Sequence, residues 1–413
     1  MNVNTVTDVP HIGPVIGRRH CTATAAGAHC ARPLEAKEPY VKTVGALLWE
    51  PGTRSGWSVE EIELDPPKRR EVTVKLTSSG ICHSDDHVDT GDIPLGWGPI
   101  LGGHEGAGVV TEVGPEVTEL QEGDHVVLSF LPSCGKCRMC ISGYANMCEL
   151  GAGVLAGTAP DGTHRIHARG QGVGPFSYLG TFAPYAVVPV DSCVKIDPAM
   201  PLMPASLIGC GVPTGWGSAV YAAEIELGDT VVVLGTGGVG MNAVQGAVHR
   251  GARNVVTVDP VAYKREQAKI FGATHSVASF EEAVPLVAQL TNGQGADRVI
   301  ITVGVAHGEI VEQANQLTRR GGVIVLTSAA PVLQNTVEFN LFTFAMSGKR
   351  LQGTLYGSTR SKLDVPRIVD MYQRGEFKLD ELITKTYKLE DINEAFADMR
   401  DGKNIRGVIV YDD

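Results

Sequence analysis

The sequence predicts an α/β protein in which a mainly-β region is followed by a doubly wound parallel sheet. Three observations support this fold class. Short runs that alternate apolar and polar residues recur between residues 44 and 196, as in half-buried strands. Continuous apolar runs alternate with helical segments between residues 230 and 328, which is typical of a parallel sheet covered on both faces. A glycine-rich segment, residues 235–240, joins the first of these apolar runs to a helix.

The composition narrows the class of protein. The chain has 413 residues, of which 43% are apolar and 20% charged, as in soluble globular proteins of two or three domains. The net charge of −11 disfavours nucleic acids and anionic membranes as partners, and no apolar run is long enough to cross a bilayer. Nine cysteines are too few for a secreted disulfide scaffold, so we expect a reducing compartment, the cytoplasm.

The first half of the chain is expected to be mainly strands. Residues 1–43 show no periodicity and no secretory signal, and we expect a disordered N-terminal extension there. From residue 44 onward, alternation and flanking turn residues predict strands within the ranges 46–51, 59–64, 71–80, 106–114, 123–130 and 179–196.

The second half is expected to alternate strands and helices. A helix entered through glycine and proline is predicted within residues 209–223. Buried strands are predicted at 230–235, 254–259, 298–304 and 321–328, with helical segments between them. The final residues predict two helices, 365–375 and 392–402, and a closing strand, 406–411.

The glycine-rich segment has the context that a dinucleotide-binding (Rossmann) fingerprint requires. It follows a buried strand and opens a helix, and Asp259 ends the next strand. The backbone of the motif is expected to hold a pyrophosphate at the helix N-terminus. Asp259 would bind the adenosine ribose hydroxyls and repel a 2′-phosphate, and no arginine follows it directly, which favours NAD over NADP. The expected motif residues are Gly235, Gly237, Gly238, Val239 and Gly240.

The segment 80–105 carries a candidate catalytic metal site. Cys82 and His104 are good ligands for zinc, and hydroxyl and carboxylate groups lie between them. A catalytic zinc needs a third protein ligand and an open position, for which Cys210 is the candidate. Cys193 lies in a strand-like run and is expected to be a small core residue.

Four further cysteines form a compact cluster with the spacing C-x2-C-x2-C-x7-C. Four thiolates from one short lobe can complete a tetrahedral shell, which predicts a structural zinc site. An iron–sulfur cluster is the competing interpretation, because four cysteines also ligate such clusters. The residues are Cys134, Cys137, Cys140 and Cys148.

These motifs occur together and in a fixed order, with GICHSDDH at 80–87, GHEGAG at 103–108, IGCG at 208–211 and NIRG at 404–407. Over residues 44–413 the chain resembles the zinc-dependent medium-chain alcohol dehydrogenase family. Within that family it resembles the actinobacterial NDMA-dependent alcohol dehydrogenases. These are nicotinoproteins, which keep NAD(H) bound during turnover and are associated with the redox peptide mycofactocin.

The resemblance implies a domain organisation and a zinc site. A GroES-like catalytic domain would comprise residues 44–211 and 353–413, around a Rossmann NAD-binding domain of residues 212–352. The implied ligands of the catalytic zinc are Cys82, His104 and Cys210. Asp85 would fix the zinc-bound histidine, and Glu105 would lie behind the metal.

The resemblance also implies contacts to substrate and cofactor. Ser84 would bind the alcohol oxygen, and His87 would carry the proton to solvent. The remaining implied contacts are His83 at the pyrophosphate (where many members have arginine), Thr214 near the nicotinamide, Lys264 near the adenosine ribose, Arg406 at the pyrophosphate and Phe130 in the substrate pocket.

The expected function is hydride transfer between a primary alcohol or aldehyde and NAD(H), with two zinc ions per chain. Zinc would lower the pKa of the alcohol, and the nicotinamide would accept the hydride. One alternative is a mycothiol- or glutathione-dependent formaldehyde dehydrogenase, which shares the zinc and the fold. Another is a non-catalytic NAD-binding protein, although such relatives typically lack the complete zinc set. A homo-oligomer is implied, and the long segment after Cys148 favours a dimer. Mycofactocin is the candidate redox acceptor.

Overall fold

The computed structural model describes residues 40–333 and 336–412. The predicted N-terminal extension therefore lies outside the described residues up to residue 39. Its last residues, 41–43, already belong to the first strand, β1 (Val41–Leu48). None of the helices within the described ranges combines the length and apolar character needed to span a bilayer.

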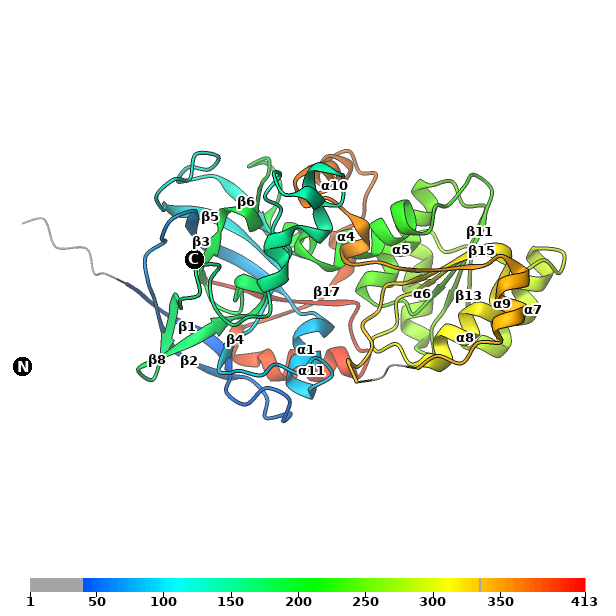
Figure 1. Cartoon of the computed structure of the whole chain (residues 1–413), viewed down its shortest axis with the longest axis horizontal. Coiled ribbons are helices and arrows are strands. Elements are labelled where there is room, and N and C mark those ends of the chain that lie inside the picture. The colour runs from blue at the N-terminus through cyan, green and yellow to red at the C-terminus, as the bar shows by residue number, and fades with distance from the viewer. Residues whose placement is uncertain (1–39, 334–335, 413) are drawn as a thin grey trace, which may run out of the picture. The chain divides into compact units, whose positions relative to one another are not determined.

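The first half of the chain, together with the last two strands, folds into a closed barrel and a second sheet (Figure 1). The barrel contains β1, β2 (Ser58–Leu64), β7 (Ile166–Ala168), β8 (Gln171–Pro175) and β4 (Ile100–Leu101). The second sheet runs in the order β10-β6-β5-β3-β18-β17, and β9 also pairs with β3. Its strands are β3 (Glu71–Gly80), β5 (Gly106–Val113), β6 (His125–Leu128), β9 (Tyr185–Pro189), β10 (Cys193–Lys195), β17 (Ile383–Tyr387) and β18 (Arg406–Val410).

The pairing of β3 with β5 positions the segment 80–105. The two strands are antiparallel, and Ser79 at the end of β3 lies opposite Gly106 at the start of β5. Residues just after β3 and just before β5 therefore lie close together. Between them the chain forms α1 (His83–Thr90), which Cys82 precedes as the N-cap residue. On the other side of β3, β18 pairs through Val408 opposite Gly80, which brings the C-terminal strand to the same place.

The second half forms a six-stranded parallel sheet in the order β13-β12-β11-β14-β15-β16. This order reverses direction at β11, as in doubly wound folds. The strands are β11 (Thr230–Leu234), β12 (Asn254–Val258), β13 (His275–Val277), β14 (Ala296–Ile301), β15 (Thr318–Leu326) and β16 (Arg350–Gly353). β11 is buried at every residue, so it lacks the polar alternation of a half-exposed strand.

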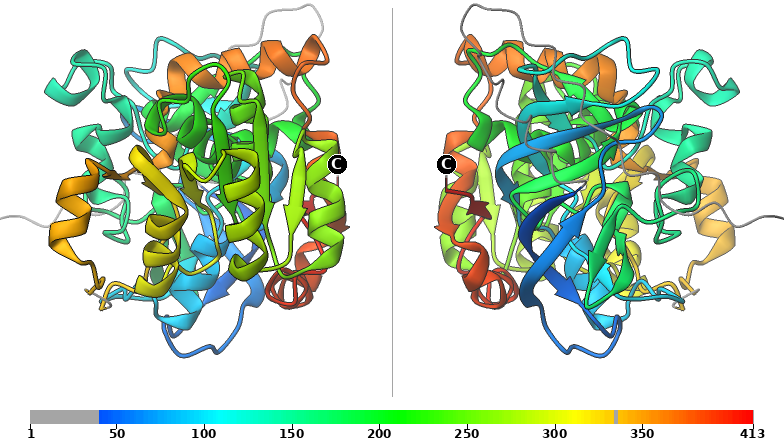
Figure 2. Two further views of the ribbon diagram at one scale, coloured as in Figure 1. Left: turned by 90° about the vertical axis from the view of Figure 1, so that its right-hand side faces the viewer. Right: turned by 90° about the vertical axis from the view of Figure 1, so that its left-hand side faces the viewer.

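Helices cover both faces of this sheet (Figure 2). Val231 and Val233 of β11 pack in a cluster with α5 (Gly238–His249) and α6 (Ala262–Ile270). Val232 and Leu234 pack in another cluster with α7 (Phe280–Leu290) and α8 (Gly308–Leu317). Successive side chains of a strand point to opposite faces, so the two clusters mark the two faces of the sheet.

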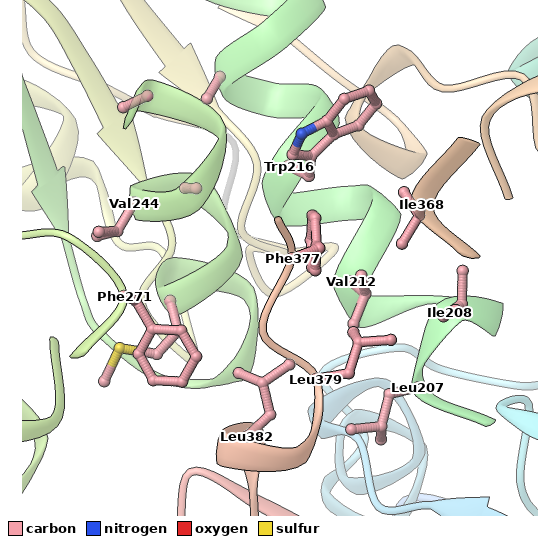
Figure 3. Packing of buried hydrophobic residues seen from close by; sticks show 14 of the residues in the cluster. Leu207, Ile208, Val212, Trp216, Val244, Phe271, Ile368, Phe377, Leu379 and Leu382 are labelled. Carbon is pink, nitrogen blue, oxygen red and sulfur yellow. The ribbon is translucent and has the colours of Figure 1, made fainter. Parts of the chain in front are cut away.

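A shared hydrophobic core joins the two halves of the fold. It contains Ala107 and Val127 from β5 and β6 as well as Val231 from β11. Figure 3 shows Val212 and Trp216 of α4 (Gly211–Gly217) packed between residues of α5 and α10 (Ser361–Gln373). This core fixes the segment that carries Cys210 against the first half of the chain. The other helices are α2 (Arg138–Ile141), α3 (Leu202–Ser206), the π-helical turn Ser218–Ala222, α9 (Leu341–Ser347) and α11 (Ile392–Arg400).

Candidate active site and metal centres

The structure brings the three predicted ligands of the catalytic metal together. Ligand atoms of Cys82, His104 and Cys210, with a carboxylate oxygen of Glu105, all lie within 4.8 Å of one another. Each comes from the end of an element: Cys82 precedes α1, His104 and Glu105 precede β5, and Cys210 precedes α4. Two sulfurs and one imidazole nitrogen are a suitable donor set for zinc.

The hydrogen bonds around His104 fit a metal at this point. Its Nδ1 lies 3.0 Å from Asp85 Oδ2, and the other oxygen of Asp85 accepts the Gly103 N–H at 2.8 Å. Both ring nitrogens of His104 are buried without a hydrogen-bond partner among the described residues, and only Nδ1 has a carboxylate beside it, that of Asp85. A buried nitrogen without a partner is costly, and a metal ion would satisfy it. Hydrogen bonding from Cys210 holds the pKa of Cys82 well below its usual range, although burial acts in the opposite direction. The lowered pKa favours the thiolate, which is the form that binds a metal.

The Glu105 carboxylate, which lies in the same group of atoms, is held by two partners. Its Oε2 forms an ion pair with Arg406, and its Oε1 accepts the backbone N–H of Gly211 at 2.9 Å. Burial raises the pKa of Glu105 to about 7, although Arg406 acts in the opposite direction. Arg406 also donates to the Ile81 carbonyl at 3.0 Å. Glu105 and Arg406 together therefore link the three chain segments that carry the ligands to β18.

Helix α1 contributes three further predicted side chains near Cys82, those of His83, Ser84 and His87. The Sγ of Cys82 lies 3.8 Å from Ser84 Oγ. His83 packs on Gly304, which follows β14, and burial lowers the pKa of His83. His87 is buried, and its Nδ1 lies 3.2 Å from Asp92 Oδ2. Helix α1 therefore places one side chain toward the sulfur and another toward the nucleotide-binding sheet.

The glycine turn lies beside the same site. Arg406 packs against Gly238, where any Cβ would collide with its side chain. Gly235 has a φ of +91°, and a Cβ at Gly240 would collide with the Gly235 carbonyl, so both positions require glycine. A Cβ at Gly237 would meet nothing within 4 Å, so there is open space beside this residue at the N-terminus of α5, where a helix favours an anion. Val239 continues this turn into α5.

Asp259 lies at the end of β12, next to the glycine turn. Its Oδ2 accepts the N–H of Thr236 at 2.8 Å and the Thr236 hydroxyl at 3.0 Å, and its Oδ1 accepts the Val261 N–H at 2.9 Å. Arg265, four residues beyond Val261, donates to the backbone carbonyls of Asp259 and Pro260 at 2.8 Å. Arg265 was not predicted here, because only the first turn of α6 brings its guanidinium back to Asp259.

The remaining predicted cofactor contacts are also near these elements. Lys264 lies on α6, with its amine close to Gly402 at the end of α11. Thr214 lies on α4, and its Oγ1 is buried without a hydrogen-bond partner in the described part of the chain. A buried hydroxyl without a partner is available to a ligand.

Aromatic rings enclose His104, and sequence reasoning found only one of them. Phe130 meets the imidazole edge-on at a centroid distance of 5.8 Å, and Phe176 does so at 5.2 Å from another side. Tyr356 packs edge-on against Phe130 at 5.1 Å. Phe176 and Tyr356 lie in short turns. An aromatic residue in such a turn belongs to no sequence motif, so the sequence does not show that it lies at a site.

The second metal centre lies in a separate lobe. The sulfurs of the four predicted cysteines lie within 4.8 Å of one another. Three backbone N–H groups point at sulfurs: Cys134 at Cys148 (3.4 Å), Cys137 at Cys134 (3.3 Å) and Cys140 at Cys137 (3.5 Å). Such N–H···S contacts stabilise thiolates, the form that binds zinc.

A thiolate–imidazole metal site beside a dinucleotide-type turn defines the class of protein, a metal-dependent nicotinamide oxidoreductase. Two family profiles agree: one for the alcohol dehydrogenase GroES-like domain matches residues 68–198, and one for zinc-binding dehydrogenases matches residues 238–374. Alcohol dehydrogenase B of Mycobacterium tuberculosis is 50% identical over 374 residues, covering 90% of this chain and 99% of that protein. The NDMA-dependent alcohol dehydrogenase of Amycolatopsis methanolica is 49% identical over 371 residues, with the same coverage.

The chain belongs to the zinc-dependent medium-chain alcohol dehydrogenase family. It is an alcohol dehydrogenase that uses zinc and a nicotinamide dinucleotide, as the resemblance implied. Among solved structures, benzyl alcohol dehydrogenase from Acinetobacter calcoaceticus has a TM-score of 0.83 at 31% identity, covering 90% of this chain and all of that one. A zinc-binding domain protein from Burkholderia ambifaria has a TM-score of 0.84 at 29% identity, covering 91% of this chain and all of that one.

Proposed function

We propose that the protein oxidises a primary alcohol to an aldehyde with a tightly bound NAD that an external acceptor reoxidises. The convergence of Cys82, His104 and Cys210 beside the glycine turn is the observation that carries this proposal. When bound, zinc lowers the pKa of an alcohol hydroxyl, and the nicotinamide accepts the hydride. The proposed GroES-like domain comprises residues 44–211 and 353–413, and the proposed NAD-binding domain comprises residues 212–352.

In this proposal the chain's own residues hold the reactants and move the proton. Cys82, His104 and Cys210 hold the catalytic metal, and Asp85 orients His104 through Nδ1. Ser84, which contacts Cys82, hydrogen-bonds the alcohol oxygen. His87 receives the proton that leaves the alcohol. Phe130, edge-on to His104, forms part of the wall that excludes water.

In this proposal the cofactor is held by residues from both halves of the fold. The residues from Gly235 to Gly240 present backbone N–H groups to the pyrophosphate, while Arg406 and His83 approach it from the other half of the fold. Thr214 contacts the nicotinamide, and Lys264 contacts the adenosine ribose. Asp259 supports NAD rather than NADP, because a 2′-phosphate would meet a buried carboxylate.

A retained cofactor is proposed because the chain is similar to an NDMA-dependent enzyme over nearly its whole length. The test is the near-ultraviolet spectrum of the purified, extensively desalted protein. We expect nicotinamide absorbance that appears on adding alcohol and disappears on adding an artificial acceptor. The natural acceptor proposed is a small redox carrier such as mycofactocin, and the proposed location is the cytoplasm. A desalted protein without nicotinamide that needs added NAD for turnover would contradict the retained cofactor.

We also propose that two copies associate through β16 and α9. β16 is an edge strand of the parallel sheet, and all four of its residues are exposed. α9 contains no buried residue, and Leu341, Phe342 and Met346 are exposed on it. An edge strand beside exposed apolar side chains is a surface that a second copy can cover.

A further inference from the structure

The residue that holds His87 is Asp92, which lies just beyond the end of α1. Helix α1 ends at Gly91, whose left-handed backbone (φ +84°) turns the chain back toward the helix. The backbone N–H groups of Gly91 and Ile93 both donate to the His87 carbonyl, at 3.1 and 3.0 Å. This turn places the Asp92 carboxylate beside the His87 ring, where Oδ2 lies 3.2 Å from Nδ1.

The Asp92 carboxylate is itself fixed in place. The Thr90 hydroxyl donates to Oδ2 at 2.9 Å. The backbone N–H of Val332, from the segment that follows β15, donates to the Asp92 carbonyl at 3.0 Å. His87 is only 3% exposed, whereas the Asp92 side chain is 29% exposed. A buried imidazole is therefore held by a carboxylate that remains in contact with solvent.

We propose that Asp92 is a positioning residue for the proton transfer, which fixes the tautomer of His87 and balances the charge of its protonated form. This inference rests on the proposed function, in which His87 receives the alcohol proton. With Nδ1–H donated to Asp92, Nε2 is the ring nitrogen with a free lone pair. It takes the proton from the alcohol side and becomes an imidazolium that faces the Asp92 carboxylate. The ring returns that proton from Nε2 to water after the aldehyde leaves.

The electrostatic surroundings of the pair support this arrangement. Burial raises the pKa of Asp92, but hydrogen bonds from Thr90 and His87 and the charge of Arg54 lower it overall, so the carboxylate stays ionised. On α1 itself, His83 is the nearest titratable ring, with its centroid 6.3 Å from that of His87. Asp86 of α1 is paired with Arg400 of α11 at 2.6 Å. The segment 328–333 packs against Asp92 without bringing a charged side chain.

The test compares Asp92→Asn with Asp89→Asn in the holoenzyme. Asp89 is a buried carboxylate on the same helix that accepts the Gly56 N–H at 3.3 Å and does not contact His87. For Asp92→Asn we expect kcat/KM for the alcohol to fall by about ten-fold or more, because an oriented general base contributes about 10²- to 10⁴-fold. The acidic limb of the pH profile should move to lower pH, because the imidazolium loses its balancing charge. Asp89→Asn should match the parent protein.

Two further measurements separate this inference from the proposed function. Nitrogen NMR of labelled histidines, assigned with His87→Gln, should show the Nδ1–H tautomer of His87 in the parent and a mixture in Asp92→Asn. If Asp92→Asn leaves the tautomer and the pH profile unchanged while His87→Gln loses activity, the inference about Asp92 is wrong and the proposed role of His87 stands. Full activity of His87→Gln would overturn the proposed proton transfer. Equal losses of activity in the Asp92 and Asp89 variants would show that both substitutions act by disturbing the packing of α1, which would overturn the inference about Asp92.

Discussion

Single side chains decide how firmly the catalytic metal is held, and Asp85 is the sharpest case. Its Oδ2 lies 3.0 Å from His104 Nδ1, and its Oδ1 accepts the Gly103 N–H at 2.8 Å. Asp85→Asn keeps the shape of the side chain, but its single amide oxygen can face either the Gly103 N–H or His104, and the NH2 group then faces the other. We expect zinc affinity to fall by about 10- to 100-fold, measured as the rate of zinc transfer to a coloured chelator.

The matched control for this prediction is Asp86→Asn. Asp86 is the next residue on α1, but its carboxylate pairs with Arg400 rather than with a ligand. Equal zinc release from the Asp85 and Asp86 variants would show that helix stability, not the bond to His104, determines retention of the metal.

Residue chemistry explains which parts of the site could be predicted from sequence. The convergence of Cys82, His104 and Cys210 could be predicted, because few residue types bind zinc and the resemblance placed all three. Tyr356 could not be identified, because its contact with Phe130 depends on a left-handed turn (φ +56°) that no residue pattern announces. Asp92 was missed for a similar reason: its meeting with His87 depends on the helix-ending turn at Gly91.

At the scale of elements, the four-cysteine lobe lacks the packing that would hold it without metal. No residue of α2 is buried, and Ile141 and Tyr144 are 72% and 60% exposed. We expect Cys140→Ser to lose one of two zinc ions per chain and to become sensitive to trypsin at Lys136 and Arg138. Metal analysis and limited proteolysis would check this, and a colourless parent protein would exclude an iron–sulfur cluster.

Cys193→Ala is the control for the lobe. Cys193 is buried in the core and belongs to neither cysteine set, so this variant should retain both zinc ions and resist trypsin. A Cys140 variant that still carries two zinc ions would contradict the assignment of the lobe.

The elements that sequence predicted best are those whose burial leaves a pattern. The strands β11, β12, β14 and β15 were found because parallel strands buried on both faces read as continuous apolar runs. Strands β7 and β8, which help to close the barrel, were not predicted, because β7 has only three residues and β8 is interrupted by glycine. Helix α1 was missed because its sequence, HSDDHVDT, has almost no apolar face.

At the scale of the whole molecule, the proposed association of two copies gives the last prediction. Antiparallel pairing of two β16 strands about a twofold axis would satisfy their unpaired backbone groups and place the apolar side chains of both α9 helices against the partner. Leu351→Asp in β16 or Phe342→Asp in α9 would put a charge into that contact. We expect sedimentation equilibrium to show a dimer for the parent and monomers for both variants. Leu227→Asp, at a side chain that is 89% exposed on the turn before β11, should remain a dimer. A buried unpaired carboxylate is too costly for such a contact, so dimeric Leu351 and Phe342 variants would mean that these residues do not form it. A monomeric parent would contradict the association itself.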